Sequence, residues 1–203
     1  MTDASKPRIR RSPEDARRVF LTCAEAVLVS DGLSAVQMRA VARRAGVTDA
    51  ALAHHFGNRD GLLSALMDHV VAKVRDAVTT IVDAWDGASS DIRTLIVELD
   101  RLYAQGYAEL AQALTQSGWR DQGPPILKPV VDALIRQNQN PDTQDNDIRR
   151  VLASLHMDLA LSPLYGDAFR RSVGLRSNRN RSEHLAWWAT SIEQMLQAPT
   201  PRN

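Results

Sequence analysis

The sequence lacks long apolar runs and has little cysteine, and each shortage excludes a class of protein. One Cys among 203 residues cannot build a disulfide framework or a cysteine-based zinc site. No run approaches the roughly 18 consecutive apolar residues that a membrane-spanning helix requires. The polar N-terminal segment MTDASKPRIRRSPED lacks the apolar region of a secretory signal. We therefore expect a soluble, cytoplasmic protein with no membrane partner.

Motifs of common enzymes are also missing from the sequence. There is no glycine-rich phosphate loop, no nucleophile elbow and no HExxH motif. His54 and His55 do not predict a metal site, because adjacent residues on a helix point about 100° apart. His156 and Asp158, two residues apart on a helix, do not face each other as an acid–base pair would. We expect no catalytic residues, no metal and no cofactor.

Composition and charge favour a folded protein with a basic N-terminal part. The apolar fraction of 44% and the charged fraction of 24% are ordinary for globular proteins and exclude a disordered chain. Residues 1–60 carry ten Lys and Arg against seven Asp and Glu, whereas the remainder carries fifteen against seventeen. A basic module on a mildly acidic body is a weak indication of contact with nucleic acid.

Apolar residues recur at helical spacing along nearly the whole chain, and no strand or internal repeat is predicted. Ser12 as N-cap, Pro13 at the first position and Gly32 as the stop predict a helix over 13–31. Further helices are predicted over 38–45, 49–56, 59–85, 91–117, 126–138, 147–162 and 182–197, with a short piece near 165–173. The helix over 147–162 is apolar on two faces and is therefore expected to be buried on both sides.

Two of the short helices are joined by Ala45-Gly46-Val47-Thr48, where Gly46 permits a sharp turn and Thr48 can cap the second helix. This arrangement, over about 37–56, describes a helix-turn-helix, but a bundle of three ordinary helices has the same spacing. Two adjacent His beside three Ala are unusual for a merely solvated face, which normally carries Lys and Glu. This composition favours the helix-turn-helix.

The stretch GLSAVQMRAVARRAGVTDAALAHHFGNRDGLLSAL resembles the DNA-binding domain of the TetR (tetracycline-repressor-like) family. The matching features, all in one register, are Gly32, Arg39, Val41-Ala42, Ala45-Gly46-Val47-Thr48, Leu52, His55-Phe56 and Leu62-Leu63. The resemblance covers about 13–70. It implies a basic arm over 1–12, a three-helix helix-turn-helix domain over 13–60, and a helical ligand-binding and dimerisation domain over 61–203. The expected fold class is all-α.

The resemblance also implies which residues contact double-stranded DNA. Side chains and backbone at the start of the two short helices would meet phosphates, and the second helix would present its outer face to base edges in the major groove. The expected DNA-binding residues are Gln37, Arg39, Thr48, Asp49, Ala50, Ala51, Ala53, His54, His55 and Arg59. Gln37 stands where the family usually has a Thr, and Ala53 where it usually has a phosphate-binding Tyr, so one contact is missing. The basic residues Lys6, Arg8, Arg10 and Arg11 of the arm could follow a minor groove or remain a solubilising tail.

In the C-terminal part, aromatic residues and a Met mark either a ligand pocket or an ordinary core. The candidates are Trp85, Tyr103, Tyr107, Trp119 and Met157. The resemblance favours a transcriptional regulator, most simply a repressor that a small, largely apolar effector releases through the helix over 59–85. A homodimer on a palindromic operator is expected, with Trp188, Ile192 and Leu196 at the interface or, alternatively, in the core. An architectural DNA-binding protein without ligand and a helical-bundle enzyme remain as alternatives.

Overall fold

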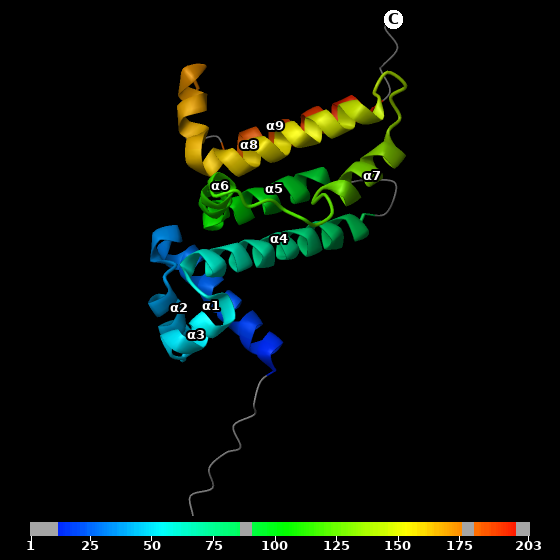
Figure 1. Cartoon of the computed structure of the whole chain (residues 1–203). Helices are drawn as coiled ribbons and strands as arrows, with labels where there is room; N and C mark the ends of the chain where they lie inside the picture. The colour runs from blue at the N-terminus through cyan, green and yellow to red at the C-terminus, as the bar shows by residue number, and fades with distance from the viewer. Residues whose placement is uncertain (1–11, 86–90, 176–180, 198–203) are drawn as a thin grey trace, which may run out of the picture. The chain divides into compact units, whose positions relative to one another are not determined.

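The computed structural model describes residues 12–85, 91–175 and 181–197, and within these ranges the chain is helical with no strand (Figure 1). Contacts divide the chain into one unit that extends to Met67 and a second unit from Asp68 onward. The elements are α1 (Pro13–Asp31), η1 (Leu33–Ala35), α2 (Met38–Ala45), α3 (Asp49–Phe56), α4 (Arg59–Asp83), α5 (Ile92–Leu102), η2 (Tyr103–Tyr107), α6 (Ala108–Gln116), α7 (Lys128–Gln137), α8 (Asp145–Ser172) and α9 (Arg181–Leu196). The predicted all-α fold with an N-terminal three-helix module is confirmed.

The first helix begins and ends as its sequence predicts. The Ser12 hydroxyl accepts a hydrogen bond from the backbone N–H of Asp15 at 3.0 Å, and Pro13 occupies the first helical position. Gly32 ends the helix with a φ of 81°, which side chains with a Cβ rarely adopt. These signals act within a few residues, which is why they predict the bounds of α1 directly.

The core of the first unit joins the apolar stripe of α1 to the two short helices. Phe20, Ala24 and Leu28 of α1 are buried, as are Val41 of α2 and Leu52 of α3. Burial of each large side chain stabilises the fold by roughly 1.5–3 kcal/mol. Both short helices are therefore held by their inner faces, and their outer faces stay free.

One predicted helix of the second unit is interrupted. The prediction of a continuous helix over 91–117 is wrong, because α5 stops at Leu102 and the kinked segment η2 separates it from α6. Gln105 and Gly106 leave helical geometry, and Gly106 has a φ of 90°. Apolar spacing continues across Gly106, so the sequence pattern alone gives no sign of the interruption.

Another predicted boundary does not exist. The prediction that a helix ends at residue 162 and a separate piece follows near 165–173 is wrong, because α8 continues through Pro163 to Ser172. Proline has no N–H for the Leu159 carbonyl and its ring crowds that carbonyl, so a helix that contains it bends. Figure 1 shows this bend between the yellow and orange parts of α8.

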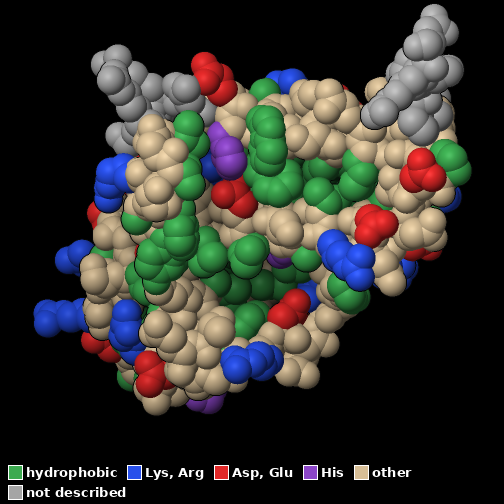
Figure 2. Space-filling model, turned by 90° about the horizontal axis from the view of Figure 1, so that it is seen from above, with side chains coloured by type: hydrophobic (Ala, Val, Ile, Leu, Met, Phe, Trp, Pro, Cys, Tyr) green, Lys and Arg blue, Asp and Glu red, His purple; other side chains and the backbone are tan. Residues whose placement is uncertain are grey.

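The second apolar face of α8 is not buried within the subunit, contrary to the prediction from its sequence. Met157 is 60% exposed and Phe169 is 64% exposed, and Trp187 of α9 is 58% exposed. Figure 2 shows hydrophobic side chains gathered on this side of the molecule. We call this surface the α8–α9 apolar face; its exposed members are Met157, Leu161, Tyr165, Phe169, Val173, Leu175 and Trp187.

The stripe of α9 packs inward instead. Ile192 and Leu196, expected as alternatives at an interface or in the core, are buried in the subunit. Trp188 is half-buried and its indole N–H donates to the Asp158 carboxylate at 3.1 Å. The core alternative therefore holds for Ile192 and Leu196. Among the described helices, none is long and apolar enough to cross a membrane.

Candidate nucleic-acid interface

The turn between α2 and α3 has the geometry that its sequence predicts. Gly46 adopts the left-handed conformation (φ 69°, ψ 32°), and the Val47 N–H returns to the Ala42 carbonyl at 3.0 Å. The Thr48 hydroxyl accepts from the N–H of Ala51 at 3.2 Å and so caps α3. This short, closed turn fixes the direction in which α3 leaves α2.

The eight residues of α3 divide into an anchored face and a free face. Leu52 is fully buried and Phe56 is 8% exposed, so these two residues attach the helix to the core. Asp49, Ala50 and His54 are exposed on the other side. Ala51 and Ala53 lie half-buried at the edge of the free face. The free face is therefore small, and three of its members end at Cβ.

The two histidines of α3 have different environments. The His55 ring packs edge-on against Phe20 of α1, with 5.2 Å between ring centroids. The His55 carbonyl also accepts a hydrogen bond from Arg17 at 2.9 Å, and the Arg17 guanidinium lies 4.6 Å from the centre of the Phe56 ring. His55 thus ties α3 to α1, whereas the exposed His54 is available to a partner.

The start of α2 is open, as expected for a surface that meets phosphates. Gln37 occupies the N-cap position without a capping bond, and its side-chain amide donates to the Ser34 carbonyl at 2.9 Å. Arg39, the second residue of α2, is exposed. Arg43 and Arg44, which were not among the predicted site residues, are exposed as well and form no side-chain hydrogen bond within the described residues. Their signal in the sequence is that both fall outside the apolar stripe of α2.

Arg59 is the predicted site residue whose side chain is most engaged inside the protein. Its Nε donates to the Val36 carbonyl at 2.8 Å, and its Nη2 donates to the Leu33 carbonyl at 3.2 Å. Both acceptors belong to the connection between α1 and α2. The guanidinium at the start of α4 therefore holds this connection in place, and its contact with phosphate stays a prediction.

The start of α4 approaches the end of α3 closely. Asn58 caps α4, because its side-chain oxygen accepts from the Gly61 N–H at 2.9 Å. A Cβ placed on Gly61 would lie 2.1 Å from the Phe56 carbonyl oxygen. Since that oxygen belongs to the backbone, the contact cannot be relieved by a side-chain rotation, and only glycine fits here. The angle between α3 and α4 depends on this position.

The basic arm with Lys6, Arg8, Arg10 and Arg11 lies outside the described residues, so its role stays a prediction. In the second unit, the structure separates the predicted ligand residues. Tyr107 is 2% exposed in the core, whereas Met157 is on the exposed α8–α9 apolar face. Trp119 donates to Asp68 at 3.2 Å, and the Trp85 indole N–H is buried without a partner among the described residues.

Tyr103, the fifth predicted ligand residue, bonds to His156 of α8. Burial raises the pKa of Tyr103 to about 12, and burial lowers the pKa of His156. Both groups are therefore neutral near pH 7, and the pair is a neutral hydrogen bond.

His156 also lines a cavity of about 490 Å³ between α7, α8 and the segment before α7. We call it the α7–α8 cavity; its lining residues are Asp121, Pro125, Ile126, Leu127, Lys128, Val131, Arg149, Leu152, Ala153 and His156. Arg75 of α4 reaches the same segment, where it pairs with the Asp121 carboxylate and donates to the Pro124 carbonyl at 2.9 Å. A residue of α4 is therefore bonded to the wall of the cavity.

Comparison with known proteins agrees with this geometry. Residues 20–66 match the family model described as bacterial regulatory proteins, tetR family. The HTH-type transcriptional regulator BetI of Escherichia coli O45:K1 is 34% identical over 62 residues, which cover 30% of this chain and 32% of that protein. BetI of Stenotrophomonas maltophilia is 28% identical over 89 residues, 43% of this chain and 45% of that protein. The chain thus matches less than half of the length of these relatives.

Solved structures resemble the chain over most of its length. A putative TetR-family transcriptional regulator from Mesorhizobium loti superposes with a TM-score of 0.63 at 15% identity and covers 92% of this chain and 98% of that one. A TetR-family transcriptional regulator from Pectobacterium atrosepticum gives a TM-score of 0.60 at 19% identity, with 95% and 100% covered. At such low identity, the likeness concerns the fold of both units and not the ligand or the DNA sequence.

Proposed function

Because the N-terminal domain of this chain belongs to the TetR family of bacterial regulatory proteins, we propose that the protein is a sequence-specific, DNA-binding transcriptional regulator. The observation that carries the proposal is the free face of α3. It follows α2 through a closed turn, is capped at its start, and exposes Asp49, Ala50 and His54 while Leu52 and Phe56 anchor the helix. Such a helix enters the major groove, where base edges carry a full donor and acceptor code.

Within this interface, some residues would contact base edges and so read the DNA sequence, and others would contact phosphates and so position the protein on the DNA. His54 can donate to or accept from a base edge, and the methyl groups of Ala50 and Ala51 suit apolar contact with thymine methyls. The exposed cations of α2, Arg39, Arg43 and Arg44, fit phosphate contacts, as do the Gln37 and Thr48 positions at the helix starts. Arg59 and His55 act first as internal anchors in this scheme.

The regulator acts as a homodimer on a palindromic operator in this proposal. One recognition helix of eight residues offers little surface compared with the roughly 1,000–2,500 Å² of specific protein–DNA interfaces, and a two-fold pair doubles it. The α8–α9 apolar face supplies the surface for a second copy of the chain. Large exposed apolar patches of this kind mark interfaces, and two copies related by a two-fold axis would cover it on both subunits.

A small, largely apolar ligand in the α7–α8 cavity would lower the affinity for DNA. Apolar residues dominate the cavity wall, and His156 adds a polar contact. The Arg75 bonds to Asp121 and Pro124 give the ligand a route to α4, because a ligand that displaces this wall also pulls on Arg75. Arg59 lies sixteen residues earlier on the same helix and holds the α1–α2 connection.

The test is selection of bound fragments from the source genome, followed by gel-shift measurement with the selected site and a scrambled site. A sequence-selective shift supports the regulator and removes the enzyme alternative, whereas equal binding to both sites would favour an architectural protein. The matched variants are His54→Ala on the free face of α3 and Glu183→Ala, an exposed residue of α9. Only the first is expected to change the preference for the selected site.

The proposed ligand response has its own test. Thermodynamic linkage requires that the operator lower the affinity for the ligand by the same factor by which the ligand lowers the affinity for the operator. Ligand affinity measured by tryptophan fluorescence should fall when operator saturates the protein. Arg75→Ala should leave ligand affinity in the free protein nearly unchanged and reduce that mutual weakening. If no ligand of the α7–α8 cavity is sensitive to operator, the regulatory part of the proposal fails while the DNA-binding part stands.

A further inference from the structure

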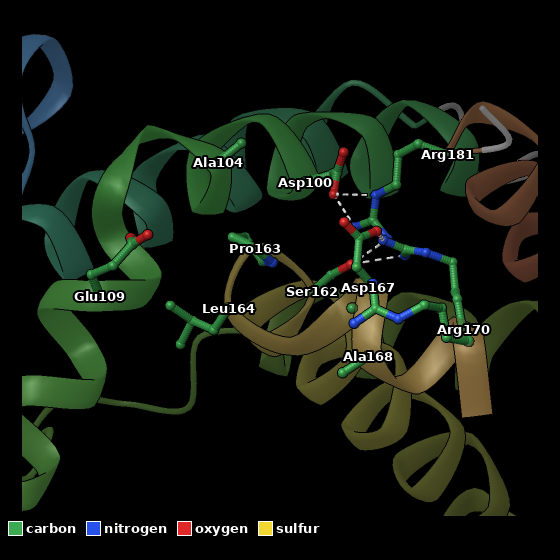
Figure 3. Close-up of a pocket in the computed structure, with 12 residues that line it drawn as sticks. Asp100, Ala104, Glu109, Ser162, Pro163, Leu164, Asp167, Ala168, Arg170 and Arg181 are labelled. Carbon is green, nitrogen blue, oxygen red and sulfur yellow. Dashed lines mark hydrogen bonds and ion pairs between the residues drawn. The ribbon is translucent and has the colours of Figure 1, made fainter. Parts of the chain in front are cut away.

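A separate cavity of about 530 Å³ lies where α5, η2, α6 and the second half of α8 meet (Figure 3). Its wall contains both irregular helical segments of the second unit, since Ala104 of η2 and Pro163 of α8 line it. Regular helices pack with their axes 8–10 Å apart and leave no such space. Two independent interruptions meet here, the kink at Gln105 and Gly106 and the proline inside α8, and together they leave room for a cavity. We call it the arginine cavity.

Three arginines line the cavity; Arg170 and Arg181, which lie at one end of it, have carboxylate partners. Arg181 donates through Nε to Asp100 at 2.9 Å and through Nη1 to the Ser162 hydroxyl at 2.8 Å. Arg170 pairs with Asp167 at 2.7 Å, but its Nε is buried and has no acceptor in the described part of the chain. Arg171 lines the cavity and forms no ion pair with any described residue. The cavity wall therefore offers an unmatched donor, Arg170 Nε, and one positive charge without a carboxylate partner among the described residues, that of Arg171.

The opposite end carries the complementary feature. Figure 3 shows Glu109 of α6 on the far side of the cavity from Asp100, Arg170 and Arg181. Its Oε2 is buried and accepts no hydrogen bond from the residues that the structure describes. A buried carboxylate oxygen without a donor is unfavourable, and so is a buried guanidinium N–H without an acceptor. Both would be satisfied by one molecule that carries a donor at one end and an acceptor at the other.

We propose that the arginine cavity binds a small zwitterion of the amino-acid type. Its ammonium group pairs with Glu109, and its carboxylate accepts from Arg170 Nε and from Arg171. The charges of the wall favour this class, because Arg170 and Arg181 are paired with Asp167 and Asp100, which leaves Glu109 and Arg171 as one negative and one positive charge. A volume of about 530 Å³ falls within the range of small-molecule sites. The site shares no described lining residue with the α7–α8 cavity, so it is distinct from the cavity of the proposed function.

The binding test uses isothermal titration calorimetry on the full chain without DNA. The probes are 4-aminobutanoate, 6-aminohexanoate and 8-aminooctanoate, each compared with the amine and the carboxylic acid of the same chain length. At least one amino acid should bind about tenfold or more tightly than both of its matched controls, since each added charged hydrogen bond is worth about that factor. If no amino acid exceeds its controls, the proposal is wrong.

Two substitutions test which residue binds the ammonium group of the ligand and which binds its carboxylate. Glu109→Gln should reduce the affinity for the best amino acid to that of the matched carboxylic acid, and Arg171→Gln should reduce it to that of the matched amine. Glu183→Gln, on the exposed side of α9 and outside the cavity, should change neither. Unchanged binding in Glu109→Gln would overturn the assignment.

Thermal melting of the ligand-free variants separates a binding role from a structural one. Because Glu109→Gln replaces a carboxylate whose Oε2 is buried without a donor among the described residues, the ligand-free variant should melt at or above the temperature of the wild-type protein. A lower melting temperature would show that Glu109 supports the fold and would contradict the proposal. Gly166→Ala gives a further check, because its Cβ would lie 3.0 Å from both terminal nitrogens of Arg170 and should weaken binding of the carboxylate.

Discussion

Replacement of Arg59 by alanine tests whether this side chain stabilises the folded chain or contacts a DNA phosphate. The Val36 carbonyl accepts only from Arg59 Nε among the described residues, and Val36 is fully buried. The Leu33 carbonyl keeps a second donor, the Val36 N–H at 3.2 Å, and so loses less. A lost bond from a charged donor costs roughly 1.5–3 kcal/mol when it leaves a buried acceptor unpaired. The melting temperature should fall by about 3–12 °C in a chain of this length.

Arg44→Ala is the matched control, because Arg44 is exposed on α2 and has no bond to another described residue. This variant should melt like the wild-type protein. If Arg44 contacts phosphate in each subunit of a dimer, the slope of log affinity against log salt should decrease by about 2, close to 0.9 for each contact. The assay is circular dichroism melting together with gel shifts at four salt concentrations.

The two variants should therefore separate stability from phosphate contact. Arg59→Ala is expected to lower the melting temperature, and Arg59→Lys should lower it less, since lysine keeps the positive charge but lacks the planar fork of donors that binds both carbonyls. A variant Arg59→Ala that melts like the wild-type protein, with only its salt slope reduced, would refute the anchoring role. Arg59 would then be a phosphate contact alone.

Four further outcomes follow from the geometry. His54→Ala should cost about 1–3 kcal/mol at one base position of each half-site, and competition with operator variants would reveal a uniform loss if His54 does not read a base. Gly61→Ala should lower both the melting temperature and DNA affinity, because its Cβ would meet the Phe56 carbonyl at 2.1 Å, whereas the same change at the open Gly57 position strains only the backbone. Phe169→Glu should give monomers in sedimentation experiments, while Val97→Glu, at an exposed apolar residue of α5, should leave the dimer intact. Burial lowers the pKa of His156, so the unfolded chain takes up its proton first; stability should fall as the pH drops below about 6.5, and urea unfolding of His156→Gln should show a smaller loss.

The sequence predicts the first unit better than the second for a physical reason. Caps such as Ser12 and Thr48 and left-handed glycines such as Gly32 and Gly46 act over four residues, so local patterns determine the bounds of α1, α2 and α3. The interruption at Gly106 has no local mark, because apolar spacing continues on both sides of it. There the packing of the second unit, and not the local sequence, decides the geometry.

In the candidate site, too, some features follow from the local sequence and others depend on contacts between residues that are distant in sequence. Which residues of α3 face outward follows from the apolar pair Leu52 and Phe56, four residues apart. What His55 and Arg59 do instead depends on Phe20, Leu33 and Val36, whose contacts are distant in sequence. Helical periodicity places a side chain on a face, but it does not reveal that an arginine on that face is held by two carbonyls.

The alanines on the free face of α3 have a consequence for how such a protein diverges. Ala50 is exposed and takes no part in the buried pair that anchors the helix, so a longer polar side chain there adds a base contact without disturbing the core. A duplicated gene could thus acquire a new DNA site by one or two substitutions while the second unit stays unchanged. If the free face of α3 reads base edges as proposed, these short side chains make its specificity easy to rewrite by design.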